Sequence, residues 1–87
     1  MPIEAGCVVK SIAGHDANSF YVVTSVQDGY VTLADGKVRM LERPKRKSVK
    51  HIRKTNEMLD LSGINTNKKL RNALRAFCGK EGGTALV

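Results

Sequence analysis

Short segments of β-branched, aromatic and other apolar residues dominate the first half of the chain and are typical of β-strands. Residues 6–12, 20–26 and 30–34 carry this pattern most clearly. Asp28 and Gly29 separate the second segment from the third and predict a tight hairpin, because glycine accepts a positive φ without a Cβ clash. The pattern therefore predicts three consecutive strands, the last two of which form a hairpin.

Two further strands are expected after a second turn signal at Asp35 and Gly36. Residues 37–42 alternate charged and apolar side chains at a period of two, as a half-buried strand does. Val49 and Ile52 are the apolar positions of a last short strand. Five short strands at these intervals predict a mainly β fold, a small barrel whose closure removes exposed strand edges.

The pattern changes to a helical period near the C-terminus, and we predict one helix over residues 67–78. Asn65 or Thr66 is a suitable N-cap, because its side-chain oxygen accepts a hydrogen bond from an amide of the first turn. Gly79 stands where a C′ glycine would end the helix.

The predicted helix has an apolar stripe and a basic face. The apolar positions are Leu70, Ala73, Leu74 and Phe77. We expect them to pack as core, and a partner-binding groove is the alternative if the barrel does not cover them. The opposite face carries three cations, Lys68, Arg71 and Arg75, which are neighbours at helical spacing.

At 87 residues the chain accommodates one small domain with an appendage. We expect a barrel over residues 1–54, a linker with the basic helix over 55–80, and a flexible tail over 81–87. No apolar run approaches the roughly 20 residues of a transmembrane helix. The first residues lack the basic and apolar parts of a signal peptide. A soluble, cytoplasmic protein is therefore expected.

Positive charge is concentrated in residues 43–54, which we call the basic run. It holds seven of the fifteen Lys and Arg residues and no acidic side chain, in a chain of formal net charge +7. Such a segment attracts a polyanion, because each phosphate that a cation neutralises releases counterions. A solvated, disordered surface segment is the alternative interpretation. We expect phosphate contacts from Arg43, Lys45, Arg46, Lys47, Lys50, His51, Arg53 and Lys54.

Other candidates for chemistry are few. Cys7 and Cys78 form no CxxC pair, so we expect two buried thiols and neither a metal nor a cofactor. His15 stands beside Asp16, but no nucleophile is marked near them, so we expect a turn and not an enzyme. The aromatic residues that could stack on bases are Phe20, Tyr21, Tyr30 and Phe77. Phe20 and Tyr21 cannot both face outward, because adjacent strand residues point to opposite faces.

Three stretches of the first half together resemble the KOW motif. They are Gly6-x-Val8-Val9-x-Ser11-x-Ala13-Gly14-x-Asp16, Tyr21-Val22-Val23 and Val31-x-Leu33-x-Asp35-Gly36. Over roughly residues 3–54 the chain is similar to large-subunit ribosomal proteins of the L fourteen e type, which also have a basic segment ending near a Lys-His pair, here Lys50-His51. Its overall shape also resembles small bacterial KOW-domain RNA-binding proteins.

The KOW resemblance implies an SH3-like barrel whose loop contacts RNA, and often ribosomal protein as well. In this chain the loop residues would be Ala13, Gly14, His15 and Asp16. The chain departs from the motif at Asn18-Ser19, where many members have Gly followed by Lys. The missing lysine weakens the phosphate contact that the resemblance implies at this point of the loop.

These observations lead to one hypothesis and two alternatives. The hypothesis is a non-enzymatic RNA-binding protein that docks on structured RNA, which we expect to be ribosomal. The helix cations Lys68, Arg71 and Arg75 are candidates for additional RNA contacts. In the first alternative, the barrel edge and the helix bind a protein of the translation or transcription machinery, and the charge steers an acidic partner. The second alternative is a barrel that binds DNA, since phosphate contacts do not distinguish the two nucleic acids.

Overall fold

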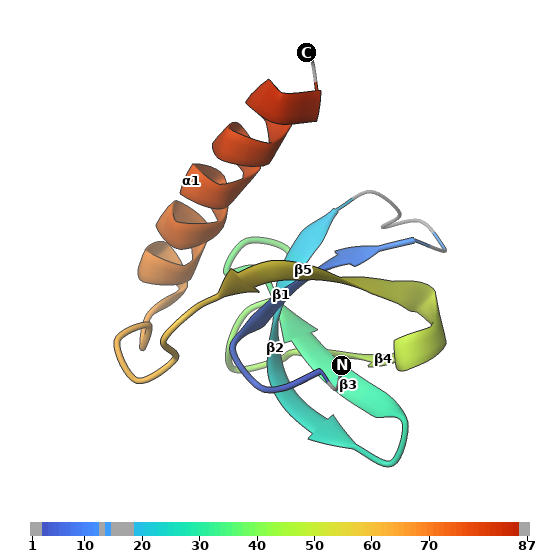
Figure 1. The fold of residues 1–87 in the computed structure, drawn as a ribbon. Coiled ribbons are helices and arrows are strands. Elements are labelled where there is room, and N and C mark those ends of the chain that lie inside the picture. The colour runs from blue at the N-terminus through green and yellow to red at the C-terminus, as the bar shows by residue number, and fades with distance from the viewer. Residues whose placement is uncertain (1–2, 13, 15–18, 86–87) are drawn as a thin grey trace.

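The computed structural model describes residues 3–12, 14 and 19–85 and contains five strands, a short 3-10 helix and one α-helix. In chain order these are β1 (Cys7–Ser11), β2 (Phe20–Gln27), β3 (Tyr30–Ala34), β4 (Lys45–Ser48), η1 (Val49–His51), β5 (Ile52–Met58) and α1 (Asn67–Ala85). The strands form a single antiparallel sheet in the order β4-β3-β2-β1-β5 (Figure 1). This mainly β architecture, with η1 between the last two strands, is consistent with the expected SH3-like barrel.

The three strands expected from the first half of the chain are confirmed. Val8 pairs with Val22 across β1 and β2, and Val31 pairs with Val26 across β2 and β3. Asp28 and Gly29 connect β2 to β3 with φ values of 49° and 82°, which is the positive-φ pair of a tight hairpin turn. The sequence alone predicted this turn because its geometry depends only on the two residues that form it.

The predicted strand over residues 37–42 is wrong, because a side chain closes this segment into a loop. The Asp35 carboxylate accepts hydrogen bonds from the backbone amides of Lys37 at 2.9 Å and Arg39 at 2.8 Å. The Arg39 carbonyl in turn accepts from the amides of Asp35 and Gly36. These bonds use the backbone groups that a strand would offer to a neighbour, so the fourth strand forms later, at β4.

The basic run supplies the last two strands of the sheet. Its first part is β4, which pairs with β3, and its end belongs to β5, which pairs with β1. Between them η1 is capped by Ser48, whose hydroxyl accepts from the Lys50 amide at 3.3 Å. Strand β5 continues to Met58, four residues into the stretch that the sequence suggested was a linker. The run is therefore part of the barrel wall.

The barrel interior is the first of two apolar clusters. It contains Cys7, Val9, Tyr21, Val23, Val31, Leu33 and Ile52. These residues come from four strands and alternate with outward-facing neighbours, as the period of two requires. The expectation of a buried thiol is confirmed for Cys7, whereas the side chain of Cys78 lies outside the described part of the structure.

The second cluster joins α1 to the outer face of the sheet. It contains Val8, Val22, Ala34, Leu70, Leu74 and Phe77. The rings of Phe20 and Phe77 meet edge to face, with centroids 5.1 Å apart. The apolar stripe of the helix is therefore core, as expected, and the barrel covers it.

Helix α1 begins where the sequence indicated and ends later. The Thr66 hydroxyl accepts from the Lys69 amide at 3.2 Å, which confirms Thr66 as the N-cap. The predicted end at Cys78 is wrong, since the helix continues through Gly79 to Ala85. Glycine within a helix costs only about 1 kcal/mol, and the following Lys80 and Glu81 favour helix. The expected tail is thus helical as far as Ala85, and residues 86–87 are outside the described range.

The Cys7 thiol allows a pH-dependent test of the barrel core. Burial raises the pKa of this thiol, and the nearby Lys54 ammonium opposes the shift only in part. The folded protein therefore holds the thiol proton more tightly than the unfolded chain does. This contribution is fully present below the unfolded thiol pKa of about 8.5 and is lost as the pH rises above it.

We expect the free energy of unfolding of a Cys78→Ser variant to fall between about pH 8 and pH 10. The same decline should be shallower once Cys7→Ala is added, because Ala carries no titrating thiol. Urea denaturation at several pH values measures both curves. Parallel curves would show that Cys7 makes no contribution.

Candidate nucleic-acid interface

The alternation of strand β4 divides the cations of the basic run between the two faces of the barrel wall. Arg46 is exposed on the outer face, whereas Lys47 is only 9% exposed and points inward. The Lys47 ammonium donates a hydrogen bond to the Ser11 hydroxyl of β1 at 2.7 Å. Because β1 and β4 are not adjacent in the sheet, this bond crosses the barrel interior.

Lys47 must therefore be removed from the expected set of phosphate contacts. Its ammonium group lies inside the barrel, where it is the hydrogen-bond donor to the buried Ser11 hydroxyl. The period of two in β4 explains the change, since a strand with successive cations must turn one of them inward. The sequence identified the charge density correctly but did not indicate which cation belongs to the interior.

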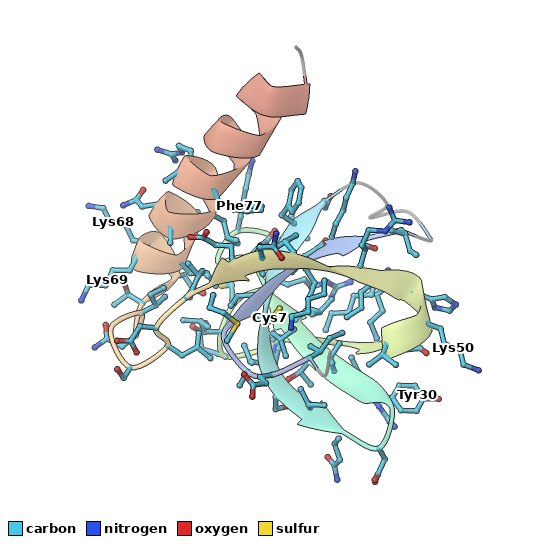
Figure 2. The ribbon with its side chains drawn as sticks, in the orientation of Figure 1. Cys7, Tyr30, Lys50, Lys68, Lys69 and Phe77 are labelled. Atoms are coloured by element: carbon cyan, nitrogen blue, oxygen red, sulfur yellow. The ribbon has the colours of Figure 1, made fainter. Side chains whose placement is uncertain are left out.

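The outer cations of β4 and η1 border a shallow groove beside an aromatic ring. The groove has a volume of about 500 Å³ and is lined by Tyr30, Lys45, Arg46, Lys47, Ser48 and His51. Tyr30 is the first residue of β3 and pairs with Ser48, which brings its ring to the basic run. Lys50 projects at the same end of the barrel as Tyr30 (Figure 2). We refer to Lys45, Arg46, Lys50 and His51 as the basic surface.

The guanidinium of Arg46 stacks on Tyr30, with its central carbon 4.2 Å from the ring centroid. Arg46 pairs with Thr32, so it lies diagonally across from Tyr30 on the same face of the sheet. An arginine over an aromatic ring is held by cation–π attraction and loses little of its hydrogen-bonding capacity. The pair therefore fixes one cation in place while its edge stays available to an anion.

A second hollow, of about 300 Å³, lies on the other side of the Tyr30–Arg46 pair. It is lined by Ser25, Gln27, Asp28, Tyr30, Val31, Thr32 and Arg46. The hydroxyl groups of Ser25 and Thr32 in its lining are linked, because Thr32 Oγ1 lies 2.7 Å from Ser25 Oγ. Thr32 Oγ1 also lies 2.5 Å from Oγ1 of the neighbouring Thr24. Arg46 lines both hollows, but the rest of this hollow offers neutral polar groups and one carboxylate, whereas the groove also presents Lys45 and His51.

Three other cations of the basic run do not line this groove. Arg43 belongs to a turn before β4 and lines a separate hollow with Val38, Arg39, Met40 and Glu42. Arg53 is exposed on β5, where it pairs with Lys10 of β1. Lys54 is half-buried and lies close enough to Cys7 to affect the thiol pKa. The run is thus not one continuous contact surface.

The loop implied by the KOW resemblance is represented in the described structure by Gly14, which is exposed and has a φ of 84°. Such a φ suits a glycine in a turn. Ala13, His15 and Asp16 lie outside the described residues. The expected loop contacts therefore stay a prediction.

The cations of α1 lie on another side of the molecule. Lys68 and Lys69 project from the first turn of the helix, opposite Tyr30 and Lys50 (Figure 2). Arg71 has a structural contact, because its guanidinium donates to the Gly36 carbonyl at 2.8 Å. Arg75 is exposed and lines a hollow of about 350 Å³ together with Ser19, Phe20, Asp35, Lys37, Arg71 and Leu74. The helix cations and the basic surface do not form a single patch.

Sequence reasoning missed the polar neighbours of Tyr30. Ser25, Gln27 and Thr32 carry no charge and match no motif, so only the pairing of β2 with β3 places them beside the ring. Tyr30 itself was a candidate for base stacking, and the period of two in β3 already places it on one face with Thr32. Its contact with Arg46 needed the fourth strand in its observed register.

No protein-family model matches this sequence, and a search of curated proteins found no match. Within the described ranges, no helix is both long and apolar enough to cross a membrane. No three His, Cys, Asp or Glu side chains of the described residues lie together as a metal site would require. The candidate interface thus rests on the geometry of the basic surface and of Tyr30.

Proposed function

We propose that this protein binds RNA without catalysing a reaction, and that the basic surface contacts the sugar–phosphate backbone. The observation that carries the proposal is the groove that Lys45, Arg46 and His51 line together with the exposed Tyr30 ring. Lys50 adds an exposed ammonium at the same end of the barrel. Clustered cations on a rigid strand attract phosphates and lose less side-chain freedom than cations on a disordered segment.

The fold supports this proposal over the alternative of a solvated, disordered surface segment. Most of the basic run is hydrogen-bonded into the barrel as β4, η1 and β5, so the positions of its cations are determined by the sheet. The single five-stranded antiparallel sheet is also consistent with the SH3-like barrel that the KOW resemblance implies. We therefore propose ribosomal RNA as the target. A cytoplasmic location is part of the same proposal.

The alternative of a protein-binding module relied on two surfaces, the barrel edge and the apolar side of the helix, and the second is not available. Leu70, Leu74 and Phe77 are buried against the sheet, so the apolar side of α1 is not an open groove. The barrel edge is left as the candidate for that role. Pull-down after nuclease treatment separates the hypotheses, because a directly bound protein partner would survive removal of RNA.

The basic surface can be tested by a double substitution with a charge-matched control. Arg46→Gln with Lys50→Gln should weaken binding to a short unstructured RNA by roughly tenfold in dilute salt. It should also reduce the slope of log K against log salt by about 1.4, which corresponds to two phosphate contacts on a single strand. Fluorescence anisotropy over a salt series measures both quantities, and equal-length DNA as competitor tests the DNA alternative.

Lys37→Gln with Lys69→Gln removes the same charge from two exposed residues that belong neither to the basic surface nor to the other candidate contacts, and serves as the control. This variant should retain the affinity and the slope of the original protein. Equal losses in the two variants would mean that binding follows net charge and that the basic surface is not the site. Absence of RNA binding by the unaltered protein in dilute buffer would refute the function itself.

A further inference from the structure

We propose, as an extension of the RNA-binding function above, that Tyr30 and Arg46 form a stacking site for one unpaired base. The protein would then select nucleotides in a loop, a bulge or a single strand over fully paired RNA. The bases of an RNA helix are stacked on one another, so a protein ring can stack only on a base that has left the helix. This inference identifies the class of RNA, which the phosphate contacts alone do not.

The Tyr30 ring has the position that such a site needs. It is 43% exposed, although it lies in a strand, and it belongs to neither apolar cluster. The Arg46 guanidinium, 4.2 Å from the ring centroid, holds it in place. A base that packs on the exposed part of this pair extends a stack whose orientation is already determined, so little side-chain entropy is lost on binding.

The two hollows beside the ring differ in a way that matches the two halves of a nucleotide. Arg46 lines both hollows, and the groove on one side adds Lys45 and His51, which suit a phosphate. The hollow on the other side presents hydroxyl and amide groups from Ser25, Thr32 and Gln27. Those groups can hydrogen-bond to the edge of a base.

The position of Asp28 indicates which hollow would hold the base and which would hold the phosphate. It lines the hollow with the neutral polar groups and is absent from the lining of the basic groove. A carboxylate repels a phosphate but accepts hydrogen bonds from the amino groups of bases. The base therefore belongs on the Asp28 side of Tyr30, and its phosphate on the Lys45 side.

Substitution of Tyr30 tests the stacking site without removing a charge. Tyr30→Leu should weaken binding to a short unstructured RNA by roughly 5- to 150-fold, the usual effect of losing one aromatic stacking partner. Binding to a perfectly paired RNA duplex of the same length should be unchanged. Tyr30→Phe retains the ring and should bind both RNAs as the original protein does.

Tyrosine fluorescence provides a second readout that does not depend on the leucine variant folding well. The chain has no Trp and two Tyr, of which Tyr21 is buried in the barrel. The unstructured RNA should quench the emission of the original protein, because a base stacked on Tyr30 quenches its ring. Tyr30→Phe should bind equally well and lose this quenching.

The outcomes separate the stacking site from the function on which it rests. Undiminished binding of the unstructured RNA by Tyr30→Leu, or equal losses on both RNAs, would overturn the stacking site and leave RNA binding intact. Unchanged quenching in Tyr30→Phe would overturn it as well. Failure of the original protein to bind either RNA would instead overturn the proposed function.

Discussion

Replacing Leu70 by Ala should destabilise the protein by about 2–5 kcal/mol, the usual cost of removing a buried leucine side chain. Leu70 is fully buried between α1 and the sheet, in contact with the cluster that includes Val8 and Val22. Both valines belong to strands whose other face lines the barrel interior. A cavity under the helix therefore weakens the sheet as well as the helix, and a small domain has only about 5–15 kcal/mol in total.

Urea denaturation followed by circular dichroism measures this loss. Asn72→Ala is the matched control, because Asn72 is exposed on the same helix, and it should change the stability by no more than about 0.5 kcal/mol. If Leu70→Ala shifted the unfolding midpoint no more than Asn72→Ala does, α1 would not be docked on the barrel. The buried stripe would then again be a candidate partner-binding surface.

Gly36→Ala should cost roughly 2–4 kcal/mol, the sum of a strained backbone and a steric clash. Gly36 has a φ of 77°, and a Cβ there would collide with the Asn67 backbone carbonyl oxygen at the start of α1. Two hydrogen bonds also join this loop to α1. The Arg71 guanidinium donates to the Gly36 carbonyl, and the Leu41 amide donates to the Asn67 side chain at 2.8 Å. The added methyl group would force the helix away from the loop.

Gly29→Ala separates the two contributions. Gly29 has a similar φ of 82°, but a Cβ there would meet no atom within 4 Å. This variant should therefore lose only the backbone part, about 1–2 kcal/mol. Thermal or urea unfolding of both variants gives the difference, which reports the clash alone. Equal losses would contradict the close contact between the loop and α1.

The predictions that succeeded depend on short stretches of the chain. The hairpin at Asp28-Gly29 needs only two residues with positive φ, and the N-cap at Thr66 needs only one hydroxyl and one amide. The strand over residues 37–42 failed although its alternation was regular, because the Asp35 carboxylate binds the amides of its first residues. One side chain acting locally thus outweighed a pattern of six residues.

The candidate interface was only partly accessible to sequence reasoning. Charge density located the basic run, but the run supplies two strands, and alternation directs Lys47 into the barrel while Arg46 faces outward. The contact between Arg46 and Tyr30 spans sixteen positions and depends on the register of β3 with β4. A register is set by many weak contacts together, so no single motif indicates it.

From the order of its residues alone, this chain is a small basic β protein with a capped amphipathic helix, because apolar periodicity, turn residues and charge are properties of neighbouring positions. The folded molecule determines which cations reach solvent, which side of the sheet receives the helix, and which polar groups surround Tyr30. Those features arise from pairing between distant segments. Their free energy comes from burying both faces of one sheet at once, and only the complete fold satisfies that condition.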